Sequence, residues 1–432
     1  MNKQILKLAI PSILANITVP LVGIVDLAIA GHLGNAASIG GIAIGTMLFD
    51  LLYWNMGFLR VGTGGITAQA YGRKDYKAAM NAATQGIATA LTVALFIWII
   101  QWGYVEVSFS LIKCTPEVEN LARQYFFIRV WAAPATLCLM VFKGWFIGMQ
   151  NTVFPMSVDL TVNILNLVLS YILAIHTPMG IKGIAFGTII SQYLGLILAI
   201  LLIRLNFKKF FQYINIKASI KLKDMRQFFA MNGNLFVRSA CMLVIYTGFT
   251  SIAANYGNTL LAVSSVMMKL LLLYSYLVDG FAYAGEALTG RFIGENDSYS
   301  LHLVIKKLFI WCIGIGVLST VIYAFAGEPL IRLLTDNVEV IKASKPFLFW
   351  LLLMPVVSCA AFTWDGIYIG ATASRALRNG MILSSAFFIL SYLALKGIMG
   401  IQALYLAYFV HLIIRTIYMS VMAKKEIYGL LD

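Results

Sequence analysis

The chain has 432 residues, of which 60% are hydrophobic and 12% are charged, and its mean hydropathy is +0.85. Soluble proteins contain roughly 25% charged residues, so this composition excludes an ordinary soluble domain and indicates a polytopic membrane protein. The net charge of +14 argues little for nucleic-acid binding, because the basic residues lie in the breaks between apolar segments and no base-reading motif accompanies them.

The apolar segments predict an all-α fold with twelve membrane-spanning helices. Each span needs about 20 apolar residues to cross a hydrocarbon core of roughly 30 Å. We place the spans at residues 9–31, 39–59, 82–103, 124–148, 153–175, 181–203, 230–255, 259–284, 304–326, 347–370, 379–396 and 401–422.

The distribution of Lys and Arg predicts the orientation of these spans. The breaks on the side of both termini hold 19 of these residues, and the breaks on the opposite side hold 7. By the positive-inside rule both termini are cytoplasmic, in an inner or plasma membrane. We expect an N-terminal six-helix lobe at 1–205, a basic cytoplasmic linker at 206–228 and a C-terminal six-helix lobe at 229–432.

Two pairs of segments indicate an internal repeat. YGRKD at 71–75 aligns with IGEND at 293–297, and GWFIG at 144–148 aligns with GIYIG at 366–370, both with a shift of 222 residues. Chance is the alternative, because Gly-x-x-x-Gly is common in membrane helices. With six spans in each half, a repeat predicts two lobes related by a pseudo-two-fold axis along the membrane normal, an architecture that suits alternating access.

Asp26 is the most informative single residue, because it interrupts the apolar stretch 10–30 of the first span. A charge at bilayer depth costs about 2.5–3.5 kcal/mol, so such residues usually mark an ion or substrate path. The alternative is a structural carboxylate paired with a nearby donor. Pro11 and Pro20 each remove a helical hydrogen bond from the same span, which predicts either a helix that bends during transport or static kinks.

Four segments together resemble one transporter family. They are LYWNMGFLRVGTGGITAQAYG at 52–72, the first-span segment from Val25 to Gly34, the segment from Asp279 to Arg291, and DGIYIGAT at 365–372. The chain resembles the DinF branch of the MATE (multidrug and toxic compound extrusion) transporters over nearly its whole length. In that resemblance the stretch 52–72 corresponds to the second helix and the loop that follows it.

The resemblance implies a cation-coupled antiporter that exports organic, often cationic or amphipathic, compounds through a cleft between two six-helix lobes. It also implies that the coupling ion binds in the N-terminal lobe, at Asp26, Asn166 and Thr188. Ser170 stands where the family commonly has a second aspartate. The oxygens of these residues suit Na⁺, but with a single carboxylate we favour coupling to protons.

The C-terminal half has acids of its own, Asp279 and Asp365, which either face a substrate cavity or pair with partners such as Arg238 or Lys269. Glu286 and Arg291 are expected to form a salt bridge at the cytoplasmic end of their span.

Tyr53, Trp54 and Trp145 are candidate cavity residues, because aromatic faces attract cations, although ordinary packing is the commoner role of such side chains.

The sequence predicts no enzyme. It contains no phosphate-binding loop, no pairing of a nucleophile with a base, and no metal-ligand cluster. We expect a monomer in the bilayer that handles small organic substrates and uses no cofactor beyond H⁺ or Na⁺. The alternative function is a flippase for lipid-linked precursors on a similar two-lobe plan, which a basic cleft would favour.

Overall fold

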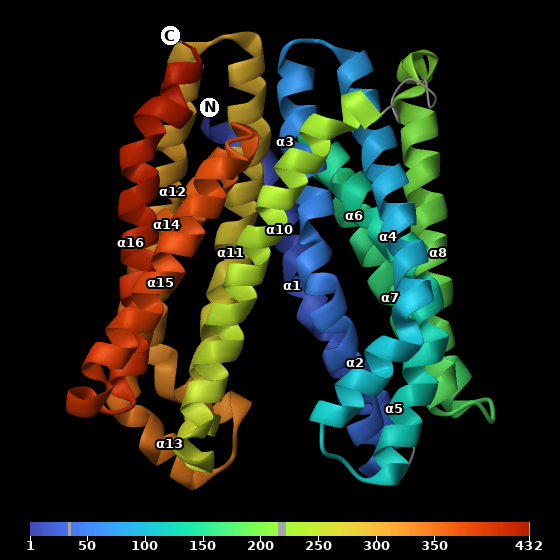
Figure 1. Cartoon of the computed structure of the whole chain (residues 1–432), viewed down its shortest axis with the longest axis vertical. Helices are drawn as coiled ribbons and strands as arrows, with labels where there is room; N and C mark the ends of the chain where they lie inside the picture. Colours follow the sequence, from blue (N-terminus) through green and yellow to red (C-terminus); the bar gives the residue numbers. More distant parts are fainter. Residues whose placement is uncertain (33–35, 215–221, 432) are drawn as a thin grey trace. The chain divides into compact units, whose positions relative to one another are not determined.

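A computed structural model describes residues 1–32, 36–214 and 222–431, and every regular element within these ranges is helical (Figure 1). The chain divides into two compact units. The first comprises Leu14–Phe229, and the second comprises Ala230–Asp432 together with Met1–Ile13. The first turns of the chain therefore group with the C-terminal helices. The lobe boundaries predicted at residues 205 and 229 stay a prediction.

The first unit contains α1 from Leu14 onward and seven further helices, α2 to α8. The elements are α1 (Asn2–His32), α2 (Ala36–Trp54), α3 (Phe58–Gly72), α4 (Tyr76–Leu111), α5 (Pro116–Arg129), α6 (Ala133–Gly148), α7 (Val153–Ile175) and α8 (Ile181–Asn206). Short 3-10 turns at Asn55–Gly57 and Val130–Ala132 join α2 to α3 and α5 to α6. Each joined pair acts as one long span.

The second unit repeats this plan. Its elements are α10 (Leu222–Ala254), of which the part from Ala230 belongs here, α11 (Asn258–Glu295), α12 (Ser298–Leu334), α13 (Val338–Ser344), α14 (Leu348–Gly370), α15 (Ser374–Met399) and α16 (Gln402–Glu426). A 3-10 turn at Lys345–Phe347 joins α13 to α14. In each unit the last two long helices, α7 with α8 and α15 with α16, pack against each other.

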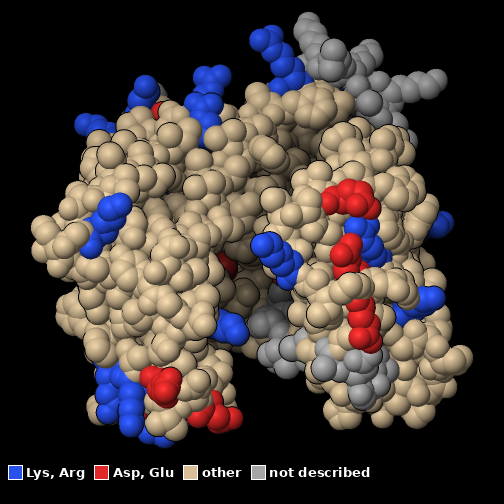
Figure 2. All heavy atoms as spheres, turned by 60° about the horizontal axis from the view of Figure 1, so that its bottom comes forward, with Lys and Arg blue, Asp and Glu red and all other residues tan. Residues whose placement is uncertain are grey.

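The described residues hold eleven helical segments that are long and apolar enough to cross a membrane. With α1, which has 31 residues, they match the twelve predicted spans. Figure 2 shows wide areas without charged side chains on the face in view; basic side chains stand along its upper edge, and acidic and basic side chains lie together at its lower left and on the right. An apolar surface of this kind suits contact with lipid.

One predicted boundary is wrong. The stretch after residue 59, which the resemblance treats as a loop, is the helix α3, Phe58–Gly72. Its glycines do not break the helix, because they are buried at a helix contact. A Cβ added to Gly148 of α6 would lie 2.7 Å from the Gly64 carbonyl oxygen, so small residues here permit close packing of the two helices.

The backbone turns confirm the 222-residue repeat. Lys74 and Asn296 both have φ of 57°, and the Asp75 and Asp297 amides that follow each donate back to a carbonyl five residues earlier. The next repeated turn carries Gln150 at φ 63° and Thr372 at φ 55°. Left-handed residues are uncommon outside glycine, so their recurrence at one spacing shows that the two units share a local design.

Candidate functional site

Asp26 of α1 is buried, with 4% of its surface exposed. Its Oδ1 atom accepts no hydrogen bond in the part of the chain that the structure describes. A buried carboxylate oxygen without a donor is costly when the group is charged, and binding a proton or a cation relieves that cost. Asp26 thus meets a first condition for the predicted ion-binding role, which stays a prediction.

Arg129 at the end of α5 is the charged residue that acts on Asp26 electrostatically, and it acts on Asp50 of α2 as well. Its guanidinium donates to the Tyr125 hydroxyl at 2.7 Å and lies 4.7 Å from the centre of the Phe49 ring. Arg129 is therefore held by neutral partners. The sequence places it only at the edge of a span and gives no sign of this role.

Asn166, Ser170 and Thr188 lie together where α7 packs against α8. The Asn166 side-chain amide donates to Thr188 Oγ1 at 2.9 Å, and the Ser170 hydroxyl donates to the Ile184 carbonyl at 3.3 Å. All three are buried, and Asn166 Oδ1 has no partner among the described residues. The structure thus brings together these three predicted residues and leaves one buried amide oxygen available as an acceptor.

A glycine explains why α7 and α8 approach so closely here. A Cβ added to Gly187 would lie 2.6 Å from both the backbone nitrogen and the hydroxyl oxygen of Ser170. Contacts below about 3 Å do not occur for real Cβ atoms, so only glycine fits.

One hydrogen bond ties α1 to α7. The Asn163 amide donates to Thr18 Oγ1 at 2.8 Å. Both helices run in the same direction, since three spans separate them. Asp26 lies eight residues beyond Thr18 and Ser170 seven beyond Asn163, so at 1.5 Å per residue both lie about 10–12 Å further along. We infer that Asp26 and Ser170 lie at a similar depth in the unit.

Pro11 and Pro20 lie within α1, which is one continuous helix from Asn2 to His32. The side chain of Pro20 lies outside the described side chains, and Pro11 is partly exposed. Bending of α1 at these residues stays a prediction.

The three candidate aromatic residues occupy different surroundings. Trp145 has no exposed surface, and its Nε1 donates to the Ala79 carbonyl at 3.0 Å, so it packs in the core of its unit. Tyr53 stacks on Phe49 with ring centres 5.5 Å apart. Trp54 is 43% exposed. Trp54 and Tyr53 thus remain candidates for ligand contact, whereas Trp145 has the packing role.

Asp365 of α14 lies between two arginines. Its Oδ2 accepts from Arg238 at 2.5 Å and also from Arg415, and all three residues are buried. The structure thus has Asp365 paired with Arg238, which is one of the two alternatives predicted for this residue. Arg415 is an additional partner that the sequence does not indicate. A carboxylate held by two guanidinium groups is poorly suited to attract a cation.

The remaining acids of the second unit differ from the expectation in one respect. Arg291 pairs with Glu295 at 2.8 Å, one turn further along α11, and Glu286 has no exposed surface. The predicted salt bridge between Glu286 and Arg291 is wrong, because a partner at i+4 lies on the same helix face as Arg291. Asp279 is partly exposed on α11 and acts electrostatically on Tyr246.

Comparison with known proteins agrees with this architecture. The family model MatE matches residues 11–172 and 235–393. The chain is 32% identical to DNA damage-inducible protein F of Escherichia coli strain K12 over 425 residues, which cover 98% of this chain and 92% of that protein. It is 25% identical over 388 residues to the probable multidrug resistance protein NorM of Thermotoga maritima, covering 88% and 80% of the two chains.

A solved structure gives the same result for the fold. The crystal structure of MATE in the bent conformation matches with a TM-score of 0.88 at 17% sequence identity, covering 99% of this chain and 96% of that one. The paired helical units and the buried polar residues define a polytopic membrane transporter with a two-lobe fold, not an enzyme. The chain belongs to the MatE family.

Proposed function

We propose that this transporter is a cation-coupled antiporter that exports organic cationic or amphipathic compounds by alternating access, with Asp26 as the coupling residue. The observation that carries the proposal is the buried Asp26 carboxylate, whose Oδ1 has no hydrogen-bond donor in the described chain. Such a group gains most from taking up a cation and loses most when the cation leaves. That difference in free energy is what coupling requires.

The internal repeat gives Asp26 no counterpart in the second unit. Under the shift of 222 residues, Asp26 corresponds to Gly248, since 26 + 222 = 248. The helix ends agree with this alignment, because α1 ends at residue 32 and α10 at residue 254. The second unit therefore lacks a carboxylate at the equivalent place, and one of its acids, Asp365, is bound to two arginines.

We favour protons over Na⁺ as the coupling ion. A sodium site needs several oxygens around the ion, and Asn166 Oδ1, Thr188 Oγ1 and one Asp26 oxygen are the candidates. Thr188 Oγ1 already accepts the Asn166 amide and donates to the Ile184 carbonyl. One carboxylate with one unsatisfied oxygen is sufficient for a proton.

The cycle we propose uses the first helix. Neutralisation of Asp26 would favour a bent α1, with Pro11 and Pro20 as the sites where the helix lacks hydrogen bonds, and would narrow the cavity of the first unit. Substrate would then be displaced outward. Replacing Pro11 and Pro20 with alanine should slow transport, and unchanged transport would contradict the bending step.

The test is efflux of a fluorescent organic cation from proteoliposomes, driven first by a proton gradient and then by a Na⁺ gradient. We expect proton-driven efflux by the wild type, none by Asp26→Asn, and normal efflux by the matched control Glu106→Gln, whose carboxylate pairs with Arg123 at an exposed position. Proton-driven efflux that persists in Asp26→Asn would contradict the proposal. Efflux driven only by a Na⁺ gradient would show that Na⁺ is the coupling ion.

The same proteoliposomes test the alternative function. If the protein moved an anionic lipid-linked precursor and ignored organic cations, a flippase would replace the exporter. We further propose that the protein is a monomer and that both termini lie in the cytoplasm. Labelling of single cysteines from each side of the membrane tests the orientation of the termini.

A further inference from the structure

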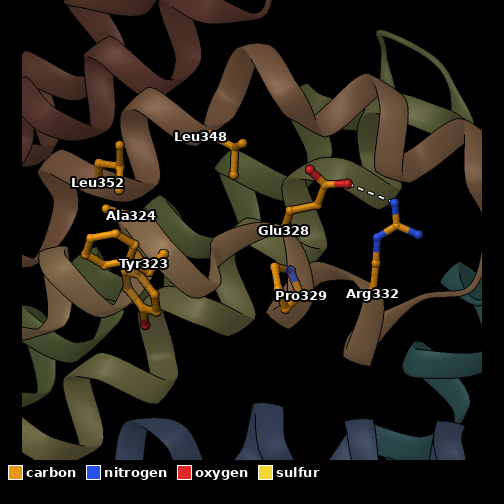
Figure 3. Close-up of a pocket in the computed structure, with 8 residues that line it drawn as sticks. Tyr323, Ala324, Glu328, Pro329, Arg332, Leu348 and Leu352 are labelled. Atoms are coloured by element: carbon orange, nitrogen blue, oxygen red, sulfur yellow. Dashed lines mark hydrogen bonds and ion pairs between the residues drawn. The ribbon is translucent and has the colours of Figure 1, made fainter.

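The second unit holds a pocket of about 440 Å³ between α12 and α14 (Figure 3). Small-molecule sites commonly measure about 300–1,000 Å³, so it is large enough for a ligand group. Its walls are formed by eight residues: Tyr323, Ala324, Phe325, Glu328, Pro329, Arg332, Leu348 and Leu352. Figure 3 shows the charged pair Glu328 and Arg332 at one end and the side chains of Tyr323, Ala324 and Leu352 at the other.

Two hydrogen bonds fix α12 against the helices beside the pocket. The Thr320 hydroxyl donates to the Leu352 carbonyl at 2.8 Å and ties α12 to α14 one turn before the pocket. The Tyr323 hydroxyl donates to the Leu270 carbonyl at 2.7 Å, which directs its ring toward α11. The pocket is therefore part of the packed unit.

The pocket lies at the boundary between lipid tails and headgroups. Between Lys307 and Glu328 the helix α12 has 20 consecutive residues without a charge, 308–327. At 1.5 Å per residue this stretch is about 30 Å long, the thickness of a hydrocarbon core. Glu328 therefore marks the edge of the core, and Arg332 lies about 6 Å further out, within the headgroup layer.

The polar end of the pocket offers a cation and two acceptors. Arg332 donates to Glu328 at 2.8 Å, and both side chains are substantially exposed, at 62% and 41%. Pro329 lies inside α12 and has no N–H to give to the Phe325 carbonyl, so that oxygen lacks its helical donor. Phe325 lines the pocket, and 85% of its surface is exposed.

We propose that this pocket binds one phospholipid that carries a phosphoethanolamine headgroup. Arg332 binds the phosphate, and the ammonium donates to the Glu328 carboxylate and the Phe325 carbonyl. The acyl chains follow the apolar residues Phe325 and Leu348 into the hydrocarbon layer. A headgroup with one positive and one negative end matches the Glu328–Arg332 pair, and only a primary ammonium has the N–H groups that both acceptors need.

The experiment compares two lipids that differ only in those N–H groups. The purified full-length protein is placed in nanodiscs of equimolar phosphatidylethanolamine and phosphatidylcholine with identical acyl chains, and the lipids that remain bound are counted by native mass spectrometry. We expect about tenfold enrichment of the ethanolamine lipid over the choline lipid. One hydrogen bond to a charged group, at the lower end of its usual strength, changes an affinity by about this factor. Equal retention of the two lipids would overturn the proposal.

Three variants assign the contacts. Glu328→Gln and Pro329→Ala should each reduce the preference for ethanolamine while a lipid is still retained, whereas Arg332→Gln should lower retention of both lipids. Glu295→Gln is the matched control, because Glu295 pairs with Arg291 at the same spacing and the same 2.8 Å distance on α11. A preference that survives in Glu328→Gln and Pro329→Ala, or that disappears in Glu295→Gln, would contradict the assignment. None of these outcomes depends on the coupling ion.

Discussion

Two buried aspartates in this protein have opposite surroundings. Both have an Oδ1 atom without a donor among the described residues, but the Oδ2 of Asp365 accepts from Arg238 and Arg415, whereas Arg129 acts on Asp26 electrostatically. Removing one member of a buried ion pair leaves the other charge uncompensated, while neutralising an unpaired buried charge relieves a desolvation cost. The same change of Asp to Asn should therefore have different effects at the two sites.

We expect Asp365→Asn to lower the free energy of unfolding by about 3–5 kcal/mol, the usual cost of breaking a buried pair. Asp26→Asn should leave stability equal or higher and abolish transport. Thermal denaturation in one detergent, followed by fluorescence, compares the two variants with the wild type. Destabilisation of Asp26→Asn by as much as Asp365→Asn would show that Asp26 is structural.

Gly187 is the second residue whose replacement gives a sharp test. Gly187→Ala places a methyl group 2.6 Å from Ser170, so α7 and α8 must separate and we expect a loss of about 1–3 kcal/mol from overpacking. Gly103→Ala in α4 is the control, because nothing lies within 4 Å of its added Cβ. Thermal melting of both variants tests this, and an unchanged melting temperature for Gly187→Ala would refute the close contact.

The residues of the site could be predicted only in part. Asp26 is visible as a charge in an apolar stretch, and Asn166, Ser170 and Thr188 enter through the resemblance to a family; the structure brings the last three together. Arg129 and Arg415 could not be assigned, because an arginine near a span end is usually exposed to headgroups. Only the three-dimensional packing shows that one lies near Asp26 and the other binds Asp365.

At the scale of elements, helix ends follow local chemistry that the sequence shows well. The Asp297 side chain accepts the Ser300 amide at 2.9 Å and caps α12, as Asp75 accepts the Ala78 amide at 2.9 Å and caps α4. Hydrogen bonds from Ser300 hold the pKa of Asp297 below its usual value. The carboxylate therefore stabilises the folded state at neutral pH, and the contribution disappears as the pH falls through that lowered pKa.

We expect Asp297→Ala to cost about 1 kcal/mol at neutral pH, the typical contribution of an N-cap. The difference from the wild type should shrink below about pH 4, where the aspartate of the unfolded chain becomes protonated, and then vanish. Melting curves of both proteins at several pH values measure this. A difference that does not depend on pH would mean that Asp297 acts through packing instead of charge.

The lengths of the elements were harder to predict than their existence. The predicted span 153–175 coincides with α7, but the predicted span 304–326 covers only the middle of α12, Ser298–Leu334. Hydropathy detects the segment in contact with lipid tails, whereas these helices continue into the headgroup layers with polar residues. A different limit applies after residue 59, where the resemblance predicts a loop and the structure has α3, because the glycines there serve a helix contact that only the packing shows.

At the scale of the whole molecule, the repeat predicted from two short motifs extends to the closest helix contacts. A Cβ added to Gly144 would lie 2.1 Å from the Arg60 carbonyl oxygen, and one added to Gly366 would lie 2.1 Å from the Ala282 carbonyl oxygen. Both pairs differ by 222 residues. The two units thus use the same contact, α6 against α3 and α14 against α11, although their charged residues differ.

Gly144→Ala and Gly366→Ala should destabilise the protein by similar amounts, since each methyl group meets backbone that cannot move aside. Because the two glycines belong to different units, the losses in the double variant should add within about 0.5 kcal/mol. Chemical denaturation of the two single variants and the double variant measures this. Loss in one variant alone would show that the two contacts are not equivalent.

These glycine contacts limit which parts of the transporter can move. Where one backbone rests directly on another, sliding or rolling of the two helices would drive main-chain atoms into each other. The α3–α6 and α11–α14 pairs should therefore travel as rigid blocks through the transport cycle. Rearrangement is left to helices that meet through flexible side chains, and the part of α1 after Ile13, which meets α7 through the Asn163–Thr18 hydrogen bond, is one of these. The start of α1 is not, because a Cβ added to Gly280 of α11 would lie 2.8 Å from the Ala9 carbonyl oxygen.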